Sequence, residues 1–91
     1  MTKIAKQTTT EPAAQKCILG CDVAKREIVI HNSATNSIHT IPNNYKALLK
    51  FFKSTTGINL VVCEATGGYE KELLNATHAL NLRAHRADPL I

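Results

Sequence analysis

Two carboxylates follow apolar segments in this chain of 91 residues. The segment Cys17-Ile-Leu-Gly-Cys is followed by Asp22, and the segment Asn59-Leu-Val-Val-Cys is followed by Glu64. Apolar runs of this length are typical of buried strands, and open α/β sheets bind ligands beside the carboxyl ends of their strands. Two neighbouring carboxylates repel each other unless a hard cation binds between their oxygens. We therefore expect Asp22 and Glu64 to hold a divalent metal ion together.

Residues beside the two acids have groups that suit a phosphate. Lys25 and Arg26 fall in the turn after Asp22, where they either steer a phosphate or are simply solvated. Gly67-Gly68 precedes a helical segment and either binds a phosphate through free backbone amides or forms a tight turn. Thr66 either caps that helix or contacts a metal-bound water. Both interpretations of each residue stay open.

The strands that must position these acids are predicted from alternation and turns. Residues 17–22 are apolar on both faces, which predicts a central strand. Residues 27–31 and 37–41 follow after short turns, which favours an antiparallel meander of three strands. Residues 59–64 predict a further buried strand, and residues 82–86 predict a fifth strand whose charged side chains suit a sheet edge.

Two helices are predicted, one before and one after residues 59–64 in the sequence. Asn43 or Asn44 caps the first helix, and Gly57 ends it. Apolar residues at helical spacing form its inward stripe: Tyr45, Leu48, Leu49 and Phe52. The second helix follows Gly67-Gly68 and carries Glu70 in its first turn, where a carboxylate suits the helix dipole.

The assembled chain is predicted to be an α/β domain with a mixed five-stranded sheet. Three strands are followed by a helix, a strand, a helix and a strand, and the two crossover connections are expected to be right-handed. The strand order across the sheet is then 3-2-1-4-5, with the helices mainly on one face. This order places Asp22 and Glu64 on adjacent parallel strands, about 5 Å apart at the backbone.

The composition limits the class of protein. The length supports one small domain, with residues 1–16 expected as a flexible tail and residues 17–91 as the folded part. The hydrophobic share of 44% suits a globular protein, and no apolar run is long enough to span a membrane. The formal net charge of +4 fits a polyanionic partner without requiring one. Without an apolar secretion signal, the chain is expected in the cytoplasm.

The three cysteines are expected to be reduced thiols. Cys21 and Cys63 directly precede the two acids, so they should lie close together on the helix-covered face. A zinc site would need further ligands to converge there, and the four histidines are scattered along the chain. Buried thiols are therefore the favoured interpretation over zinc.

The motifs around the two acids resemble a known family. Gly20-Cys-Asp22-Val-Ala-Lys25, followed by Glu64-Ala-Thr-Gly-Gly-Tyr-Glu70, is similar to the N-terminal part of DEDD-type insertion-sequence transposases. This is the IS-one-ten family, which includes the Piv-like DNA invertases. The resemblance covers nearly all of the chain after the tail. It implies a RuvC-like, ribonuclease-H-like fold, in which Asp22 matches the first acid of the DEDD set and Glu64 the second.

The resemblance also implies an activity, DNA transposition. The acids of this family bind Mg²⁺ (or Mn²⁺) at a DNA phosphate, and paired ions of this kind lie roughly 4 Å apart. The family's third and fourth acids and its C-terminal domain with a nucleophilic serine have no counterpart in these 91 residues. We therefore expect a truncated catalytic domain that binds DNA and metal without cleaving DNA alone.

Partners are expected on similar grounds. With both helices on one face, Ile18 and Leu60 or Val62 would be partly bare beside the acids, which favours pairing with a second copy or with a full-length transposase. Relatives in the family work with a structured RNA guide, so the resemblance adds RNA as a partner. The alternative hypotheses are a regulatory fragment that binds nucleic acid and interferes with intact transposase, and a plain α/β module with a stray acid pair.

Overall fold

The computed structural model describes residues 16–64 and 67–87. The expectations for residues 1–15 and for Thr66 lie outside these residues. The elements in chain order are β1 (Cys17–Val23), β2 (Glu27–Asn32), β3 (Ser37–Pro42), α1 (Tyr45–Ser54), β4 (Ile58–Glu64), α2 (Lys71–Ala79) and β5 (Ala84–Ala87). The predicted order of strands and helices is confirmed.

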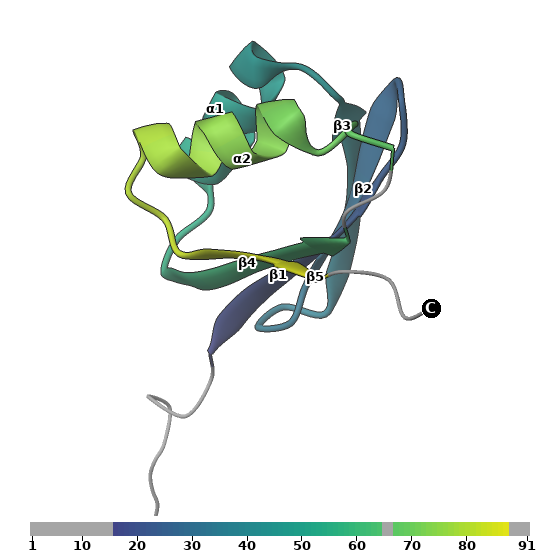
Figure 1. The fold of residues 1–91 in the computed structure, drawn as a ribbon. Helices are drawn as coiled ribbons and strands as arrows, with labels where there is room; N and C mark the ends of the chain where they lie inside the picture. The colour runs from purple at the N-terminus through teal and green to yellow at the C-terminus, as the bar shows by residue number, and fades with distance from the viewer. Residues whose placement is uncertain (1–15, 65–66, 88–91) are drawn as a thin grey trace, which may run out of the picture.

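The five strands form one mixed sheet in the order β3-β2-β1-β4-β5 (Figure 1). β1 pairs with β2 and β2 with β3 in antiparallel directions, because only short turns connect them. β4 pairs with β1 and β5 pairs with β4 in parallel, because a helix crosses over before each of them. The predicted α/β class and the strand order 3-2-1-4-5 are therefore confirmed.

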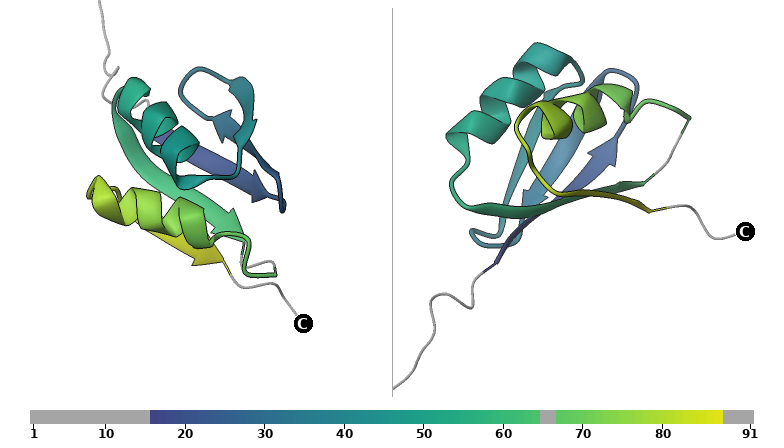
Figure 2. Two further views of the ribbon diagram at one scale, coloured as in Figure 1. Left: turned by 90° about the horizontal axis from the view of Figure 1, so that it is seen from above. Right: turned by 60° about the vertical axis from the view of Figure 1, so that its left-hand side comes forward.

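Both helices lie on the same side of the sheet (Figures 1 and 2). In β1, every second residue from Cys17 to Val23 is buried, and the residues between them are partly or fully exposed. The same alternation in β2 and β4 places one face of the sheet under the helices. The core between sheet and helices consists of Cys17, Leu19, Cys21, Val23, Ile28, Ile30, Leu48, Phe52, Val61, Cys63, Leu73 and Ala76.

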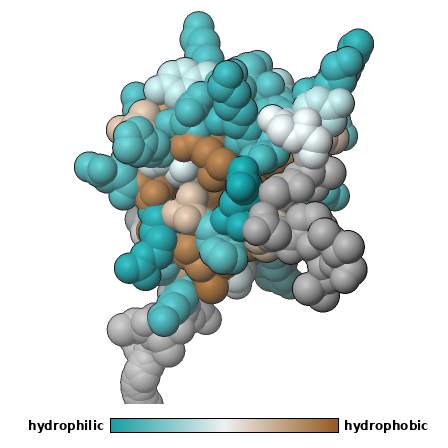
Figure 3. All heavy atoms as spheres, in the orientation of Figure 1, coloured by the Kyte–Doolittle hydropathy of each residue, from teal (hydrophilic) through white to brown (hydrophobic). Residues whose placement is uncertain are grey.

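The helix layer does not close the core completely. In the view of Figure 3, apolar side chains reach the surface in the middle of the molecule, and hydrophilic side chains surround them. Three apolar residues of α2 and the loop after it are only partly buried against the core: Leu74, Leu80 and Leu82. None of the helices in the described residues is long and apolar enough to cross a membrane.

The ends of α1 differ from the sequence prediction in one respect. Asn44 is the N-cap, and its side-chain oxygen accepts a hydrogen bond of 2.8 Å from the backbone N–H of Ala47. The helix then ends at Ser54, and Thr55 at the C-cap is already extended. Gly57 therefore does not end the helix. It turns the chain into β4 with φ +71°, a conformation that glycine adopts without strain.

The start of β5 also differs from the prediction. The strand begins at Ala84 rather than at Leu82. The backbone N–H of Leu82 instead donates to the carbonyl of Thr77 at 2.8 Å, and Asn81 is left-handed with φ 57°. Leu82 and Arg83, which were predicted to begin the strand, therefore belong to the turn that follows α2.

The other face of the sheet has no described helix over it. Ile18, Leu60 and Val62 are half-buried there, and Ile38 on the edge strand β3 is 68% exposed. The expected placement of the helices mainly on one face is thus confirmed, and the uncovered face is partly apolar.

Candidate metal centre

Asp22 and Glu64 come together at the carboxyl ends of β1 and β4. The register of these parallel strands pairs Cys21 with Cys63, so the residues that follow them are neighbours. Adjacent strands lie about 4.8 Å apart, and alternation places both carboxylates on the uncovered face. Both residues are exposed. The predicted adjacency is confirmed.

The two acids border a cavity of about 520 Å³. Its lining comes from the last residues of the two strands: Gly20, Cys21, Asp22, Val23, Val62, Cys63 and Glu64. A Cβ built on Gly20 would have no heavy atom within 4 Å, so the space over this glycine is open. The cavity therefore offers room beside the carboxylates for an ion with its water or phosphate ligands.

The donor set suits a hard divalent cation. Carboxylate oxygens are preferred ligands of Mg²⁺ and Mn²⁺, and Mg²⁺ usually keeps several waters beside one or two carboxylates. In residues 16–64 and 67–87, no group of three or more His, Cys, Asp or Glu side chains is placed to hold a metal ion. The pair would thus supply only part of a coordination shell.

The residues expected to meet a phosphate lie in the loops after the two strands. Lys25 and Arg26 are exposed in the turn between β1 and β2. Gly67 and Gly68 are exposed before α2 and have φ values of 62° and 78°, so they form the tight turn that glycine permits. A Cβ at Gly67 would lie 3.3 Å from the ring of Tyr69. All four residues follow a carboxyl end that carries an acid.

Two buried thiols lie behind the acids on the helix-covered face. Cys21 and Cys63 are paired in register and unoxidised. Burial, and to a smaller extent the neighbouring Cys63, raise the pKa of the Cys21 thiol to about 12. Burial also raises the pKa of Cys63, as does Glu70, while Arg86 lowers it. Both thiols therefore stay protonated and pack as small apolar groups, as predicted.

Glu70 lies at the start of α2, as predicted, and has a further contact that was not predicted. It is the N-cap of α2 but makes no capping hydrogen bond with its side chain, and it is 6% exposed. One oxygen, Oε2, lies 3.3 Å from Nη1 of Arg86 on β5, and Oε1 has no hydrogen-bond partner among the described residues. This ion pair was not predicted, because the charged side chains of residues 82–86 were assigned only to the protection of a sheet edge.

Asn43 is a second residue whose role the sequence did not reveal. Asn44 makes the helix cap, which leaves the neighbouring asparagine free for other contacts. The Nδ2 group of Asn43 donates to the carbonyls of Ala24 at 2.8 Å and Tyr69 at 3.0 Å. The available signal was the pair of consecutive asparagines, because only one of them can cap the helix.

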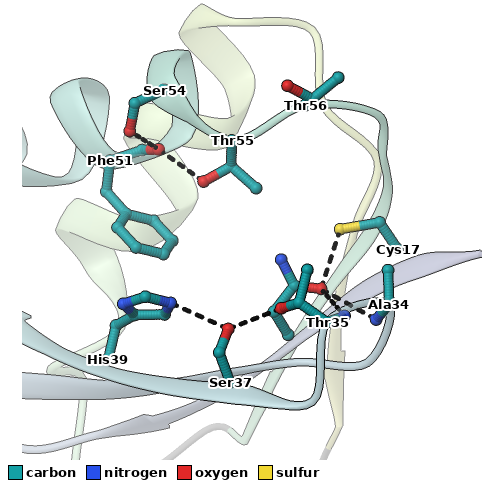
Figure 4. A pocket seen from close by; sticks show the side chains of 10 residues that line it. Cys17, Ala34, Thr35, Ser37, His39, Phe51, Ser54, Thr55 and Thr56 are labelled. Carbon is teal, nitrogen blue, oxygen red and sulfur yellow. Dashed lines mark hydrogen bonds between the residues drawn. The ribbon is translucent and has the colours of Figure 1, made fainter.

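A second cavity, of about 620 Å³, lies at the opposite end of the sheet (Figure 4). The side-chain oxygen of Asn32 accepts hydrogen bonds there from the backbone N–H groups of Ala34 and Thr35, and from the thiol of Cys17. Ser37 Oγ makes two hydrogen bonds, one of 2.6 Å with Thr35 Oγ1 and one of 3.0 Å with Nε2 of His39. The polar groups of this cavity largely satisfy one another.

Comparison with family models, with curated proteins and with solved structures finds no match to this chain.

Proposed function

We propose that this chain carries the metal-binding acid pair of a RuvC-like, ribonuclease-H-like nuclease domain that acts in DNA transposition. One observation carries the proposal: the β1–β4 register brings Asp22 and Glu64 side by side on the uncovered face, at the mouth of an open cavity. Acids at the carboxyl ends of neighbouring parallel strands are where open α/β sheets bind their ligands.

The fold is consistent with this proposal. An antiparallel meander followed by two helical crossovers, in the order 3-2-1-4-5, is the arrangement that the resemblance to DEDD transposases implies. The short strings Gly20-Cys-Asp22 and Glu64-Ala-Thr-Gly-Gly-Tyr carry that resemblance. The first places its acid in the cavity from β1, and the second places its acid there from β4.

The residues of the site divide into two roles. Asp22 and Glu64 would hold Mg²⁺ or Mn²⁺, which when bound stabilises negative charge on phosphate oxygens. Lys25 and Arg26 would contact the DNA backbone as cations. Gly67 and Gly68, together with Thr66, would bind a phosphate through the loop before α2.

Two carboxylates do not complete the shell of six ligands that Mg²⁺ prefers. Waters and a DNA phosphate would occupy the remaining positions. We therefore expect metal binding and DNA binding by this chain, without phosphodiester cleavage by the chain alone. We also propose a cytoplasmic location, where free cysteines such as these three stay reduced.

A titration with Mn²⁺ followed by NMR tests the proposal, because bound Mn²⁺ broadens the signals of nearby nuclei. Saturable broadening confined to the residues around Asp22 and Glu64 is expected in wild type and should be lost in Glu64→Gln. Glu72→Gln is the matched control, since it makes the same change of charge on α2. Equal broadening in wild type and Glu64→Gln, or none that saturates, would refute the metal site.

The uncovered face supports a second candidate function, association with another protein. Ile38 is 68% exposed, and Ile18, Leu60 and Val62 are half-buried beside the acids. The occupant would be a second copy of the chain or an intact transposase. Sedimentation of wild type and Ile38→Lys at increasing concentration, with capture by the intact enzyme, tests it. A monomer at high concentration that captures nothing would rule it out.

The nucleic acid is proposed as DNA, with a guide RNA as the alternative that the resemblance implies. Both contain the phosphates that Lys25 and Arg26 would contact. Competition between DNA and RNA of the same sequence for the wild-type chain and for a Lys25→Ala, Arg26→Ala double variant would rank them. Binding that the double variant retains in full would remove these two cations from the interface.

A further inference from the structure

Asn43 joins two loops that follow the acid-bearing strands. It lies between β3 and α1, and its Nδ2 group donates to the carbonyl of Ala24 at 2.8 Å and to that of Tyr69 at 3.0 Å. Ala24 is two residues beyond Asp22, and Tyr69 is five residues beyond Glu64. A single amide group therefore connects the loop after β1 to the loop after β4.

The direction of this amide is fixed by its surroundings. An amide has two N–H donors and one oxygen acceptor, and Asn43 uses both donors on carbonyl oxygens. Turning the group over would place its oxygen against two other oxygens. The oxygen Oδ1 instead stays buried, without a hydrogen-bond partner among the described residues. The side chain thus keeps both loop contacts although its own acceptor is left unsatisfied.

Each of the two joined loops has further contacts that hold it in place. In the turn after β1, the backbone N–H of Ala24 donates to the carbonyl of Glu27 at 2.9 Å, and the backbone N–H of Asn43 donates to Arg26 at 2.9 Å. In the loop before α2, the ring of Tyr69 packs over Gly67. Asn43 therefore connects two ordered turns, so a shift of either one would be transmitted to the other.

We infer that Asn43 is a positioning residue for the acid pair, an inference that rests on the metal site proposed above. The strand register aligns the backbones of Asp22 and Glu64, but β1 ends at Val23, one residue after Asp22, and β4 ends at Glu64 itself. The hydrogen bonds of Asn43 fix the distance between the two loops that follow the strands. They thereby hold both carboxylates in a geometry in which one ion can bind to both. Removing residues that orient metal ligands in this way commonly weakens metal affinity by about 10- to 100-fold.

The test combines two substitutions with a neighbouring control. Asn43→Ala removes both donors. Asn43→Leu also removes them but keeps the volume and leaves no orphaned oxygen, so it protects the test if the alanine variant folds poorly. Asn44→Ala is the control, because it removes the helix cap one residue away without touching either loop. Mn²⁺ affinity is measured by NMR on each folded variant.

We expect Mn²⁺ binding to weaken about tenfold in Asn43→Ala and Asn43→Leu, and to stay unchanged in Asn44→Ala. Wild-type affinity in both Asn43 variants would overturn the inference, as would equal weakening in Asn44→Ala.

Hydrogen exchange on the metal-free proteins keeps this result separate from the proposed function. Exchange at residues 23–26 and 67–70 should accelerate together in the Asn43 variants, while the turn at residues 33–36 should be unaffected. If wild type bound no Mn²⁺, the proposed function would fail. The joint acceleration would then still support Asn43 as the tie between the loops, and unchanged exchange would overturn it.

Discussion

The two cavities at opposite ends of the sheet have similar size but different chemistry. The one at the start of β1, of about 620 Å³, is lined by hydroxyl, amide, imidazole and thiol groups that hydrogen-bond to one another. The one at the carboxyl ends of β1 and β4, of about 520 Å³, is bordered by two exposed carboxylates with no ion pair to any described residue. Polar groups that still lack a partner, rather than the volume of the cavity, therefore point to a ligand site.

Among the substitutions that test this comparison, one in the cavity at the start of β1 should change stability the most. Asn32→Ala should lower the free energy of unfolding by about 3 kcal/mol, because it leaves three donors without their buried acceptor. Thr56→Ala, an exposed residue of the same lining, should change it by less than about 0.5 kcal/mol. Urea unfolding measures both. Mn²⁺ binding should be unchanged in both variants. Loss of Mn²⁺ binding in Asn32→Ala would show that the two cavities do not act independently.

An intermediate effect is expected from the thiols of the acid-bordered cavity. The pKa of Cys21 is about 12 in the folded chain, against an ordinary value near 9, so the unfolded chain loses this proton first. The stabilising effect is complete below pH 9 and declines as the pH rises from 9 towards 12, so that a measurement at pH 10 should show a loss of about 1.4 kcal/mol for one thiol.

Urea unfolding at several pH values measures this loss, with Cys21→Ala as the comparison. The variant should show a shallower decline above pH 9, since Cys21 is the only residue that differs between the two proteins. Identical slopes would mean that the Cys21 thiol is not protected from ionisation by its burial.

The smallest effect on stability is expected at the carboxylates themselves. In EDTA, Glu64→Gln should leave the free energy of unfolding within about 0.5 kcal/mol of wild type, because the residue is exposed and the change relieves like-charge repulsion. Added Mg²⁺ should then stabilise wild type in proportion to its occupancy and leave the variant unchanged. A large loss of stability in EDTA would indicate that Glu64 is a structural residue instead.

Much of the fold and the centre of the candidate site could be predicted from local patterns. Short turns dictate an antiparallel meander, and two helical connections dictate parallel strands, so the sheet order follows. Asp22 and Glu64 each follow a cysteine at the end of an apolar run, and the period of two then sets them on one face. These inferences need only residues that are close together in sequence.

The contacts that support the site could not be predicted in the same way. Asn43 reaches Ala24 and Tyr69, and Glu70 reaches Arg86, through loops whose paths depend on how the helices pack on the sheet. The predicted start of β5 was wrong because the residues before Ala84 form the turn that ends α2. Tertiary contacts of this kind override local preference and have no periodic signal.

The β1–β4 pairing also has a consequence for the order of folding. The meander β1-β2-β3 joins segments that are adjacent in sequence, whereas β1 reaches β4 only after the whole meander and α1 have been spanned. Such long-range pairing has a high entropic cost of loop closure, so we expect the meander to form first and β4 to dock late. The two acids then meet only in the last stage of folding. A metal ion bound between them would slow unfolding and leave the folding rate nearly unchanged.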